Sequence, residues 1–561
     1  MSTLSREKKR ILASNRLFFP MNRRRVVITL VFLLLIPVYW IGMHAPGVGI
    51  YHDDGIYIVT AKALAEGKGY RIISLPGEMI QTKYPVLFPA LLAIVWKIFP
   101  RFPENAIFLK MVPLIGTFFW VCLLHLFFKE KNRNANSSTG IILITLASPW
   151  VLFFSITVLS ETIFAFFCTG ALIFLHRLQD KPGNKEGLTL FFASFFAAAA
   201  FLTRTAGLPL IVAGTLSLGL RRKYRSSVKF TLISAGIVLP WILWQILFHG
   251  GNSGTYAYYS SSSYRNWNLL AHYSLEQKSI VLASNFLWLL ISPMRLLALG
   301  YVNLYFDYLL SIAITGFFII GFRSDLRKGV KSIHLFLILY YGMLLVWLWP
   351  PVRFLIPIFP FWLYFTYIGF TEILGSVSIK NRTLAIINRG FILILCLILG
   401  IGLYSSSLQT LYNQKASVVY IGEKTDDNWM EFRSLLDWVS ENTPNDAVML
   451  GMIDPAIYLY TGRKAVRGFV ANPYLLWYSD NSEESLGNIS DLLRYLLEQK
   501  VNYVIRTPGK VFKESPIFNL LLEKFISRYK GTVHLVKKGA DPEYQIYRVD
   551  QEKLQQVQFK K

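Results

Sequence analysis

The sequence predicts a polytopic α-helical membrane protein with about eleven transmembrane helices and a C-terminal extracytoplasmic α/β domain. Three observations predict this class. Of the 561 residues, 53% are hydrophobic and only 16% are charged. Apolar runs of about 17 to 23 residues, the length needed to cross a bilayer, recur along the first 410 positions. After about residue 410 the composition becomes charged and mixed.

The formal net charge of +25 does not indicate a nucleic-acid partner. Lysine and arginine gather in short loops between the apolar runs, as they do in the cytoplasmic loops of membrane proteins. Three cysteines occur, and all lie inside apolar runs: Cys122, Cys168 and Cys396. The sequence therefore predicts neither a disulfide framework nor a metal cluster.

The basic segment 1–25 predicts a cytoplasmic N-terminus. The apolar run 26–43 has no small-residue cleavage site, so we expect a retained first span and no cleaved signal peptide. This span leads outward, which places the loop 44–104 on the extracytoplasmic face.

The next apolar run, 85–99, is short for a span, carries Lys97 and has prolines at both ends. We expect it to form an interfacial helix on the outer face. The run 106–128 then returns to the basic loop KEKNR in the cytoplasm. If the short run crossed the membrane, KEKNR and every later loop would change sides.

The remaining apolar runs of the transmembrane domain 26–410 cross the membrane in alternating directions. The run 285–298 is interpreted as a further short helix at the outer membrane surface. The predicted spans are 140–159, 162–178, 188–203, 206–220, 228–248, 302–322, 333–349, 354–373 and 390–407. In the domain 411–561, periodicity predicts helices near 428–441, 484–499 and 515–528, with strands at AVMLG, NYVIRT, TVHLV and YQIYRV. The basic TGRK between them is interpreted as a turn.

Ionisable residues fall repeatedly at the outer ends of the predicted spans. Burying such groups near a membrane is costly, so they are candidates for function. Two acids and several cations on one face predict a site for an anionic ligand together with a base. The residues are Asp53, Asp54, Lys83, Glu161, Arg204 and Arg353.

Each of these residues also has a structural interpretation. Asp53 could cap the helix that runs to the EGKG stop. A single arginine at the end of a span often anchors it to the interface. Glu161 could be a buried partner of an arginine, and the aromatic WLWPP could belong to an interfacial belt.

The first outer loop resembles that of GT-C class membrane glycosyltransferases, in particular the protein O-mannosyltransferase and aminoarabinose transferase group. The resemblance rests on Asp53-Asp54, Tyr57, the EGKGY stop and Lys83-Tyr84-Pro85. LSETIF, LTRTAGLPLI, PPVRFLIPIFP and the tail segments ENTPNDAVML and VNYVIRTP are also similar. Three positions depart from the pattern, which more often has Glu at Asp54, Pro at Tyr84 and Tyr at Phe354.

The resemblance implies an inverting transfer of one sugar from a polyprenyl phosphate to a hydroxyl of a glycan, lipid or protein. It implies that Asp53 is the general base and Asp54 a supporting or metal-facing acid. Chemistry agrees, since a sugar hydroxyl needs a base and a departing phosphate needs fixed cations. The resemblance implies no definite cofactor, and the use of a divalent cation is left as an alternative. The remaining roles are donor phosphate binding by Lys83, Arg204 and Arg353, and support by Tyr57, Tyr84 and Glu161.

Three other functions stay open from the sequence. A transporter or flippase of a lipid-linked or anionic substrate would show internal repeats or broken helices near the middle of the membrane. An oligosaccharyltransferase would use a pyrophosphate donor, a metal site and a larger soluble domain. A lipid-binding scaffold would not need Asp53.

Overall fold

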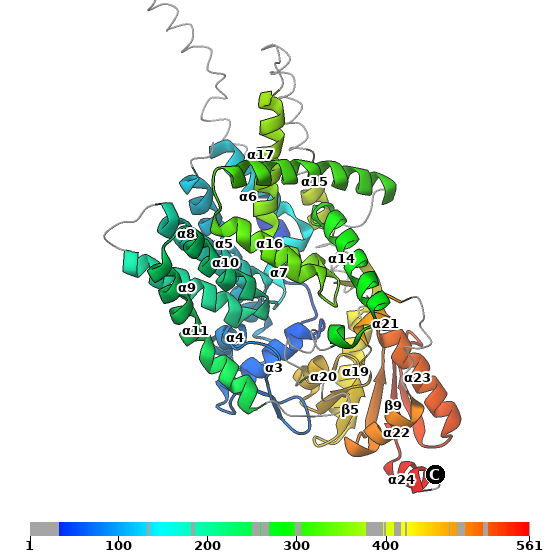
Figure 1. Ribbon diagram of the computed structural model, residues 1–561. Helices are drawn as coiled ribbons and strands as arrows, with labels where there is room; N and C mark the ends of the chain where they lie inside the picture. The colour runs from blue at the N-terminus through cyan, green and yellow to red at the C-terminus, as the bar shows by residue number, and fades with distance from the viewer. Residues whose placement is uncertain are drawn as a thin grey trace, which may run out of the picture.

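The computed structural model contains a helical part and a smaller part built around a sheet (Figure 1). It describes residues 33–559 apart from 132–134, 181–185, 249–258, 260–268, 298–303, 377–396, 398–399, 409–416, 421–422, 471, 480–487 and 509–513. The prediction for the basic N-terminus, and parts of those for the spans 26–43 and 390–407, lie outside the described residues.

Six described helices are long and apolar enough to cross a membrane, or up to seven spans if one bent pair counts as one. The protein is therefore a multi-pass membrane protein, while the count of eleven spans stays a prediction. The six are α5 (Ala106–Glu130), α8 (Glu161–Asp180), α9 (Glu186–Thr203), α11 (Tyr224–Leu247), α15 (Leu304–Arg327) and α17 (Phe359–Ser376), the last continuing the 3-10 helix η2 (Pro351–Ile358).

The predicted span 140–159 is a bent pair. Helix α6 (Ala135–Ala147) and helix α7 (Pro149–Ile156) meet at an angle of 64°. Ser148 has an extended backbone and accepts a hydrogen bond from the Val151 amide, so it caps α7. Pro149 disfavours a helical conformation in the residue before it, which breaks the helix at this point.

Several described helices are shorter. Helices α10 (Leu208–Leu220) and α16 (Ser332–Leu345), in the predicted spans 206–220 and 333–349, have 13 and 14 residues. Helix α14 (Leu275–Arg295) replaces the short surface helix predicted at 285–298. It begins earlier because Ser274 and Gln277 form a capping box at its start.

The first outer loop contains two helices that pack against each other. Helix α3 (Asp53–Ala65) ends before Gly67 and Gly69, which have φ of +74° and +78°, as the EGKG stop predicted. Helix α4 (Leu87–Ile98) has 12 residues and lies where the interfacial helix was expected. It buries Phe88, Leu92 and Trp96, whereas Ile94 and Ile98 on its other side are exposed.

Helices α15 and α17 cross in close contact through two glycines. A Cβ atom on Gly321 would overlap the carbonyl oxygen of Phe365, and one on Gly369 would overlap that of Phe317. Such small residues let two helix backbones approach, which is a common way to pack membrane helices.

The sheet of the C-terminal part has the strand order β6-β5-β7-β9-β8. Strands β6, β5 and β7 are parallel, and β9 and β8 continue the sheet antiparallel. Their bounds are β5 Val448–Gly451, β6 Lys464–Arg467, β7 Tyr503–Arg506, β8 Val533–Lys538 and β9 Gln545–Val549. The sequence predicted all of these strands except β6, which begins at the end of the predicted TGRK turn.

Helices cover both faces of this sheet. Leu450 and Val466 pack with α22 (Ile489–Glu498) and α23 (Glu514–Arg528). Met449 and Ala465 pack on the other face with α19 (Trp429–Asn442) and α20 (Asp454–Thr461). Helix α21 (Pro473–Trp477), helix α24 (Gln551–Phe559) and the hairpin of β3 (Ser417–Tyr420) and β4 (Glu423–Asn428) complete the described elements after position 410.

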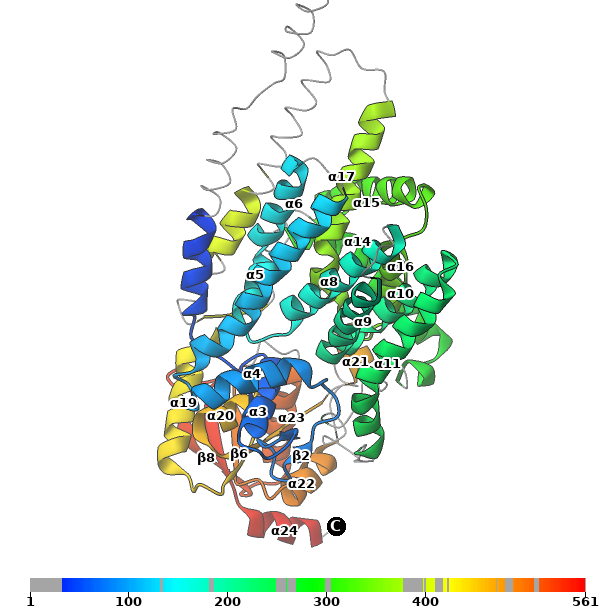
Figure 2. The ribbon, with the colours of Figure 1, turned by 90° about the vertical axis from the view of Figure 1, so that its left-hand side faces the viewer.

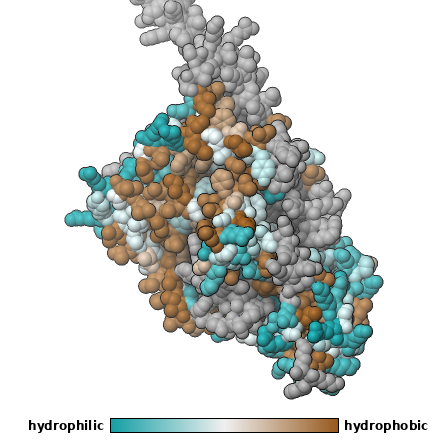
Figure 3. Space-filling model, turned by 45° about the vertical axis from the view of Figure 1, so that its right-hand side comes forward, coloured by the Kyte–Doolittle hydropathy of each residue, from teal (hydrophilic) through white to brown (hydrophobic). Residues whose placement is uncertain are grey.

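The two parts differ in surface chemistry. Figure 3 shows a largely hydrophobic surface over the helical part and a largely hydrophilic one over the C-terminal part. Exposed apolar side chains such as Phe118 on α5 and Ile246 and Leu247 on α11 contribute to the hydrophobic surface. Helix α4 contacts α5 of the helical part and α3 contacts α20 of the C-terminal part, so the segment 44–104 joins the two; in Figure 2 both helices lie below α5.

Candidate functional site

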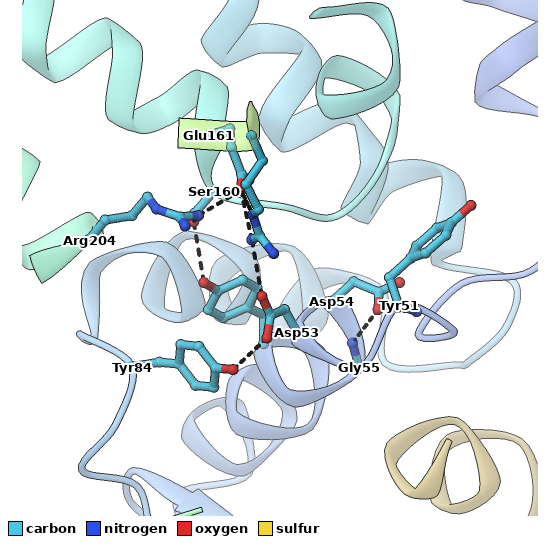
Figure 4. A network of polar contacts seen from close by, with 10 residues as sticks. Tyr51, Asp53, Asp54, Gly55, Tyr84, Ser160, Glu161 and Arg204 are labelled. Carbon is cyan, nitrogen blue, oxygen red and sulfur yellow. Dashed lines mark hydrogen bonds and ion pairs between the residues drawn. The ribbon is translucent and has the colours of Figure 1, made fainter. Parts of the chain in front are cut away.

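Four segments that are distant in sequence meet at the first turn of α3 (Figure 4). Asp53 begins this helix, and its carboxylate accepts two hydrogen bonds. Oδ1 accepts from the hydroxyl of Tyr84, just before α4, and Oδ2 accepts from Arg353 Nη2 of η2 at 3.0 Å. About a fifth of the Asp53 side chain, 21%, stays exposed.

The surroundings keep Asp53 ionised. Burial by itself raises the pKa of this carboxyl, but the charge of Arg353, the hydrogen bond from Tyr84 and the charge of Lys83 outweigh it. The pKa of Asp53 therefore lies well below its usual value.

Glu161 lies at the centre of the cluster and binds both arginines. At the start of α8 it is only 2% exposed, and its Oε1 lies 2.7 Å from Arg353 Nη2 and 2.8 Å from Arg204 Nη1. Arg204 follows α9 and also donates to Ser160 Oγ at 3.0 Å. The ring of Phe354 lies 4.9 Å from the guanidinium carbon of Arg204 and 5.7 Å from that of Arg353. The two cations are thereby held side by side.

Asp54 points away from this cluster, toward the loop backbone (Figure 4). Its carboxylate is fully buried and accepts from the backbone amides of Gly49, Tyr51 and Gly55 at 2.7, 2.8 and 2.9 Å. Burial raises the pKa of Asp54 to about 7, although these three hydrogen bonds lower it. Through these hydrogen bonds Asp54 stabilises the conformation of the loop that precedes α3.

The other predicted residues border the cluster. The Tyr57 hydroxyl lies 3.3 Å from Ser160 Oγ, and the Tyr57 ring packs edge-on against Tyr84 with centroids 5.1 Å apart. Lys83 Nζ lies 5.2 Å from the centre of the Tyr84 ring. The structure therefore brings all eight predicted residues to one end of α3, with Asp54 facing the opposite side.

The purely structural roles considered for Asp53, Glu161 and Arg353 are not all confirmed. The helix cap position belongs to His52, which makes no side-chain capping bond, and the Asp53 carboxylate binds Tyr84 and Arg353. Glu161 is a buried partner of arginine, as one alternative predicted. Arg353 is paired within the cluster, so it is more than an anchor at the end of a span.

A divalent cation has no ready set of ligands here. Among the described residues, no group of three or more His, Cys, Asp and Glu side chains could hold a metal ion. The oxygens of Asp53 accept from side chains and those of Asp54 from backbone amides. The donor set of the described residues therefore does not fit a divalent cation.

Sequence reasoning missed three contributors. Ser160 lies next to Glu161 in LSETIF, and its place before a charged helix start was a usable signal. Phe354 follows Arg353, but nothing local shows that its ring contacts two guanidinium groups. His52 precedes the acidic pair, and its partner Asp454 lies in the C-terminal part of the chain.

No protein-family model and no curated protein matches the sequence. Solved structures do match the fold. ArnT from Cupriavidus metallidurans matches with a TM-score of 0.53 at 10% identity, over 95% of this chain and 99% of that one. The same protein bound to undecaprenyl phosphate matches with a TM-score of 0.53 at 10% identity, over 93% and 97%. The archaeal oligosaccharyltransferase AglB from Archaeoglobus fulgidus, in complex with an inhibitory peptide and a dolichol-phosphate, matches with a TM-score of 0.52 at 13% identity, over 93% and 74%. The fold implied by the resemblance is confirmed.

Proposed function

We propose that this protein is an inverting glycosyltransferase that moves a sugar from a polyprenyl phosphate to an acceptor hydroxyl on the extracytoplasmic face. The observation that carries the proposal is the cluster in which a partly exposed, ionised Asp53 pairs with Arg353, while Glu161 binds both Arg353 and Arg204. Such a cluster offers a base for a hydroxyl and cations for a phosphate within one small volume.

The cations suit a lipid-linked phosphate. Asp53 and Glu161 carry two negative charges, and Arg204, Arg353 and Lys83 carry three positive charges, so the cluster has a net positive charge. An arriving phosphate diester adds the negative charge that balances it. The two guanidinium groups offer planar, two-pronged donors, and Lys83 adds a point charge.

The reaction follows from this arrangement. The acceptor oxygen attacks the anomeric carbon as Asp53 takes the hydroxyl proton. The new carbon–oxygen bond forms on the face opposite the bond to phosphate, which breaks, so the anomeric configuration inverts. Both electrons of the broken bond leave with the polyprenyl phosphate, whose charge the cations stabilise. Asp53 then returns its proton to water.

The fold supports this donor class. The two matched proteins were solved with undecaprenyl phosphate and with a dolichol-phosphate. Both ligands are polyprenyl phosphates, which is the donor class proposed here. The apolar helices around the site would place the prenyl chain in the bilayer. The acceptor class, whether glycan, lipid or protein, is left to the experiment.

The test is a transfer assay with the purified full-length protein in lipid nanodiscs. Polyprenyl-phosphate donors that carry different sugars are offered with an extract of envelope glycans, lipids and proteins, and the release of free polyprenyl phosphate is measured. We expect release from at least one donor, and loss of release in Asp53→Asn. Movement of the donor across a liposome membrane without release would instead identify a transporter or flippase.

A further inference from the structure

We propose that His52 and Asp454 together position the base: Asp454, from the C-terminal part of the chain, helps to hold His52 in a strained, positive-φ backbone conformation that sets the direction of Asp53. The inference deepens the proposed function and rests on it, because it assigns the C-terminal part a role in the same site. It makes His52 and Asp454 positioning residues, since neither contacts the cluster of arginines in the described structure.

The backbone at His52 is unusual. Its φ is +63° and its ψ is −59°, in a region that residues other than glycine rarely adopt. Such strain persists only where the surroundings fix it, and it is common at functional sites. The carbonyl of His52 accepts from the Ile56 amide at 2.9 Å, so this residue starts the hydrogen-bonding pattern of α3. A change in its torsion angles would therefore turn the first residue of the helix, Asp53.

Two features hold His52: the Asp53 amide donates to the Tyr51 carbonyl at 2.8 Å across the turn, and Asp454 packs against the His52 ring. His52 is 2% exposed and Asp454 is fully buried, and His52 Nε2 lies 3.5 Å from Asp454 Oδ1. The other carboxylate oxygen accepts from the hydroxyl of Tyr259 at 2.7 Å. The ring of Tyr259 also stacks on the His52 ring, with centroids 6.1 Å apart. Burial and the charge of Arg467 lower the pKa of His52, so a neutral ring is held between the two groups.

Apolar packing joins the same two segments. Helix α20, which begins at Asp454, lies beside α3 in both ribbon views (Figures 1 and 2). Ile56 and Val59 of α3 belong to the same hydrophobic cluster as Leu450 and Val466 of the sheet. The approach is close at Gly55, where an added Cβ would lie 2.6 Å from the Pro455 Cβ atom.

Polar contacts extend the junction along the outer loop. Lys464 Nζ donates to the Ile73 carbonyl and to Glu78 Oε1, both at 2.6 Å. The Ala465 amide donates to the Ser74 carbonyl at 2.9 Å. The loop that carries the proposed base is thus packed against the C-terminal sheet, and Asp454 contacts His52, the residue before Asp53.

The experiment compares variants of the full-length protein in nanodiscs. Asp454→Ala removes both carboxylate contacts, whereas Asp454→Asn keeps an acceptor oxygen. At His52, Gly has no Cβ and can adopt φ +63° with ψ −59°, whereas the β-branched Val cannot. Asp491→Ala, an exposed position in the same part of the chain, is the matched control. Two quantities are measured: amide hydrogen exchange over residues 53–58, and kcat and KM for the donor.

We expect Asp454→Ala and His52→Val to speed exchange over 53–58 and to lower kcat about 10- to 100-fold, as a small misplacement of a reacting group does. The donor KM should change little, because the phosphate-binding residues come from other segments. Asp454→Asn and His52→Gly should retain most of the wild-type kcat, and the control all of it.

Opposite results overturn the inference. Wild-type exchange and kcat in Asp454→Ala would show that Asp454 does not hold the helix. Equal kcat in His52→Gly and His52→Val would show that the positive-φ conformation does not matter, and this comparison also decides the case in which Asp454→Ala unfolds. A wild-type protein that releases no polyprenyl phosphate would defeat the proposed function instead, while the exchange data would still report on the positioning.

Discussion

Arg353 Nη2 lies 3.0 Å from Asp53 Oδ2, so the proposed base is paired with a proposed ligand of the donor phosphate. While this pair persists, the second oxygen of Asp53 is engaged, because Tyr84 already donates to the first. A phosphate that draws Arg353 toward itself would free Oδ2 for the acceptor hydroxyl. The arrangement favours a sequence in which the donor binds before the base becomes available.

Asp53→Asn should abolish sugar transfer and leave the fold intact. The amide fills the same space, but it cannot take a proton, and the loss of a general base typically costs about 10²- to 10⁴-fold. The measurement is transfer by purified protein, with the melting temperature as the control for folding. A variant that transfers sugar at the wild-type rate would place the base elsewhere.

Asp54→Asn should mainly lower stability. All three hydrogen bonds to the Asp54 carboxylate come from backbone amides, two to Oδ1 and one to Oδ2. Asparagine keeps one acceptor oxygen, but its NH₂ group cannot accept, so at least one of the three amides loses its acceptor. Each buried donor left without an acceptor costs about 1–3 kcal/mol. Thermal unfolding of the purified variant should show the loss. Unchanged stability together with abolished transfer would instead give Asp54 a direct role in the chemistry.

Arg353→Met should weaken use of the donor and move the acidic limb of the pH profile upward. The charge-assisted contact is worth about 1.5–3 kcal/mol, roughly a 10- to 100-fold loss in kcat/KM for the donor. Without this cation, burial of Asp53 raises its pKa, so the base is protonated at a higher pH than in the wild type. Profiles of kcat/KM between pH 4 and 8 test the shift.

The matching substitutions sharpen that test. Arg353→Lys keeps the charge, so the acidic limb should stay near the wild-type position, but the planar fork is lost and donor use should recover only in part. Lys83→Met should also weaken donor use. If Arg353→Met and Lys83→Met both keep the wild-type kcat/KM for the donor, these residues do not bind the donor phosphate. Arg204 would then be the next residue to test.

Gly369→Ala should destabilise the helical part of the protein. The added methyl group would overlap the Phe317 carbonyl at the crossing of α15 and α17, and such overpacking typically costs about 1–3 kcal/mol. Gly316→Ala, on α15 with nothing within 4 Å of an added Cβ, is the matched control and should be neutral or slightly stabilising. The melting temperatures of both variants in one detergent provide the comparison.

The proposed orientation can be tested by cysteine labelling of intact cells. In a background without native cysteines, Arg225→Cys in the loop predicted to be cytoplasmic should resist an impermeant thiol reagent. Arg494→Cys, at a position 63% exposed in the C-terminal part, should react. Both positions are exposed at the surface, so a difference would report the side of the membrane. Labelling of Arg225→Cys would reverse the predicted topology.

The sequence by itself determined the membrane class, the short outer helix and the residues that gather around α3. Hydrophobic length and loop charge are local properties, and a bilayer turns them into positions relative to two faces. Span ends carrying Glu161, Arg204 and Arg353 were therefore expected at one face before any contact was known.

Only the tertiary structure distinguished the two adjacent acids. Neighbouring residues on an α-helix point about 100° apart, so Asp53 faces the arginines and Asp54 faces the loop backbone, a difference that composition cannot reveal. The same holds for His52, whose partner Asp454 is brought to it by packing of the C-terminal sheet. Contacts between segments distant in sequence depend on how apolar faces are buried together, and no local pattern in the chain encodes their final distances.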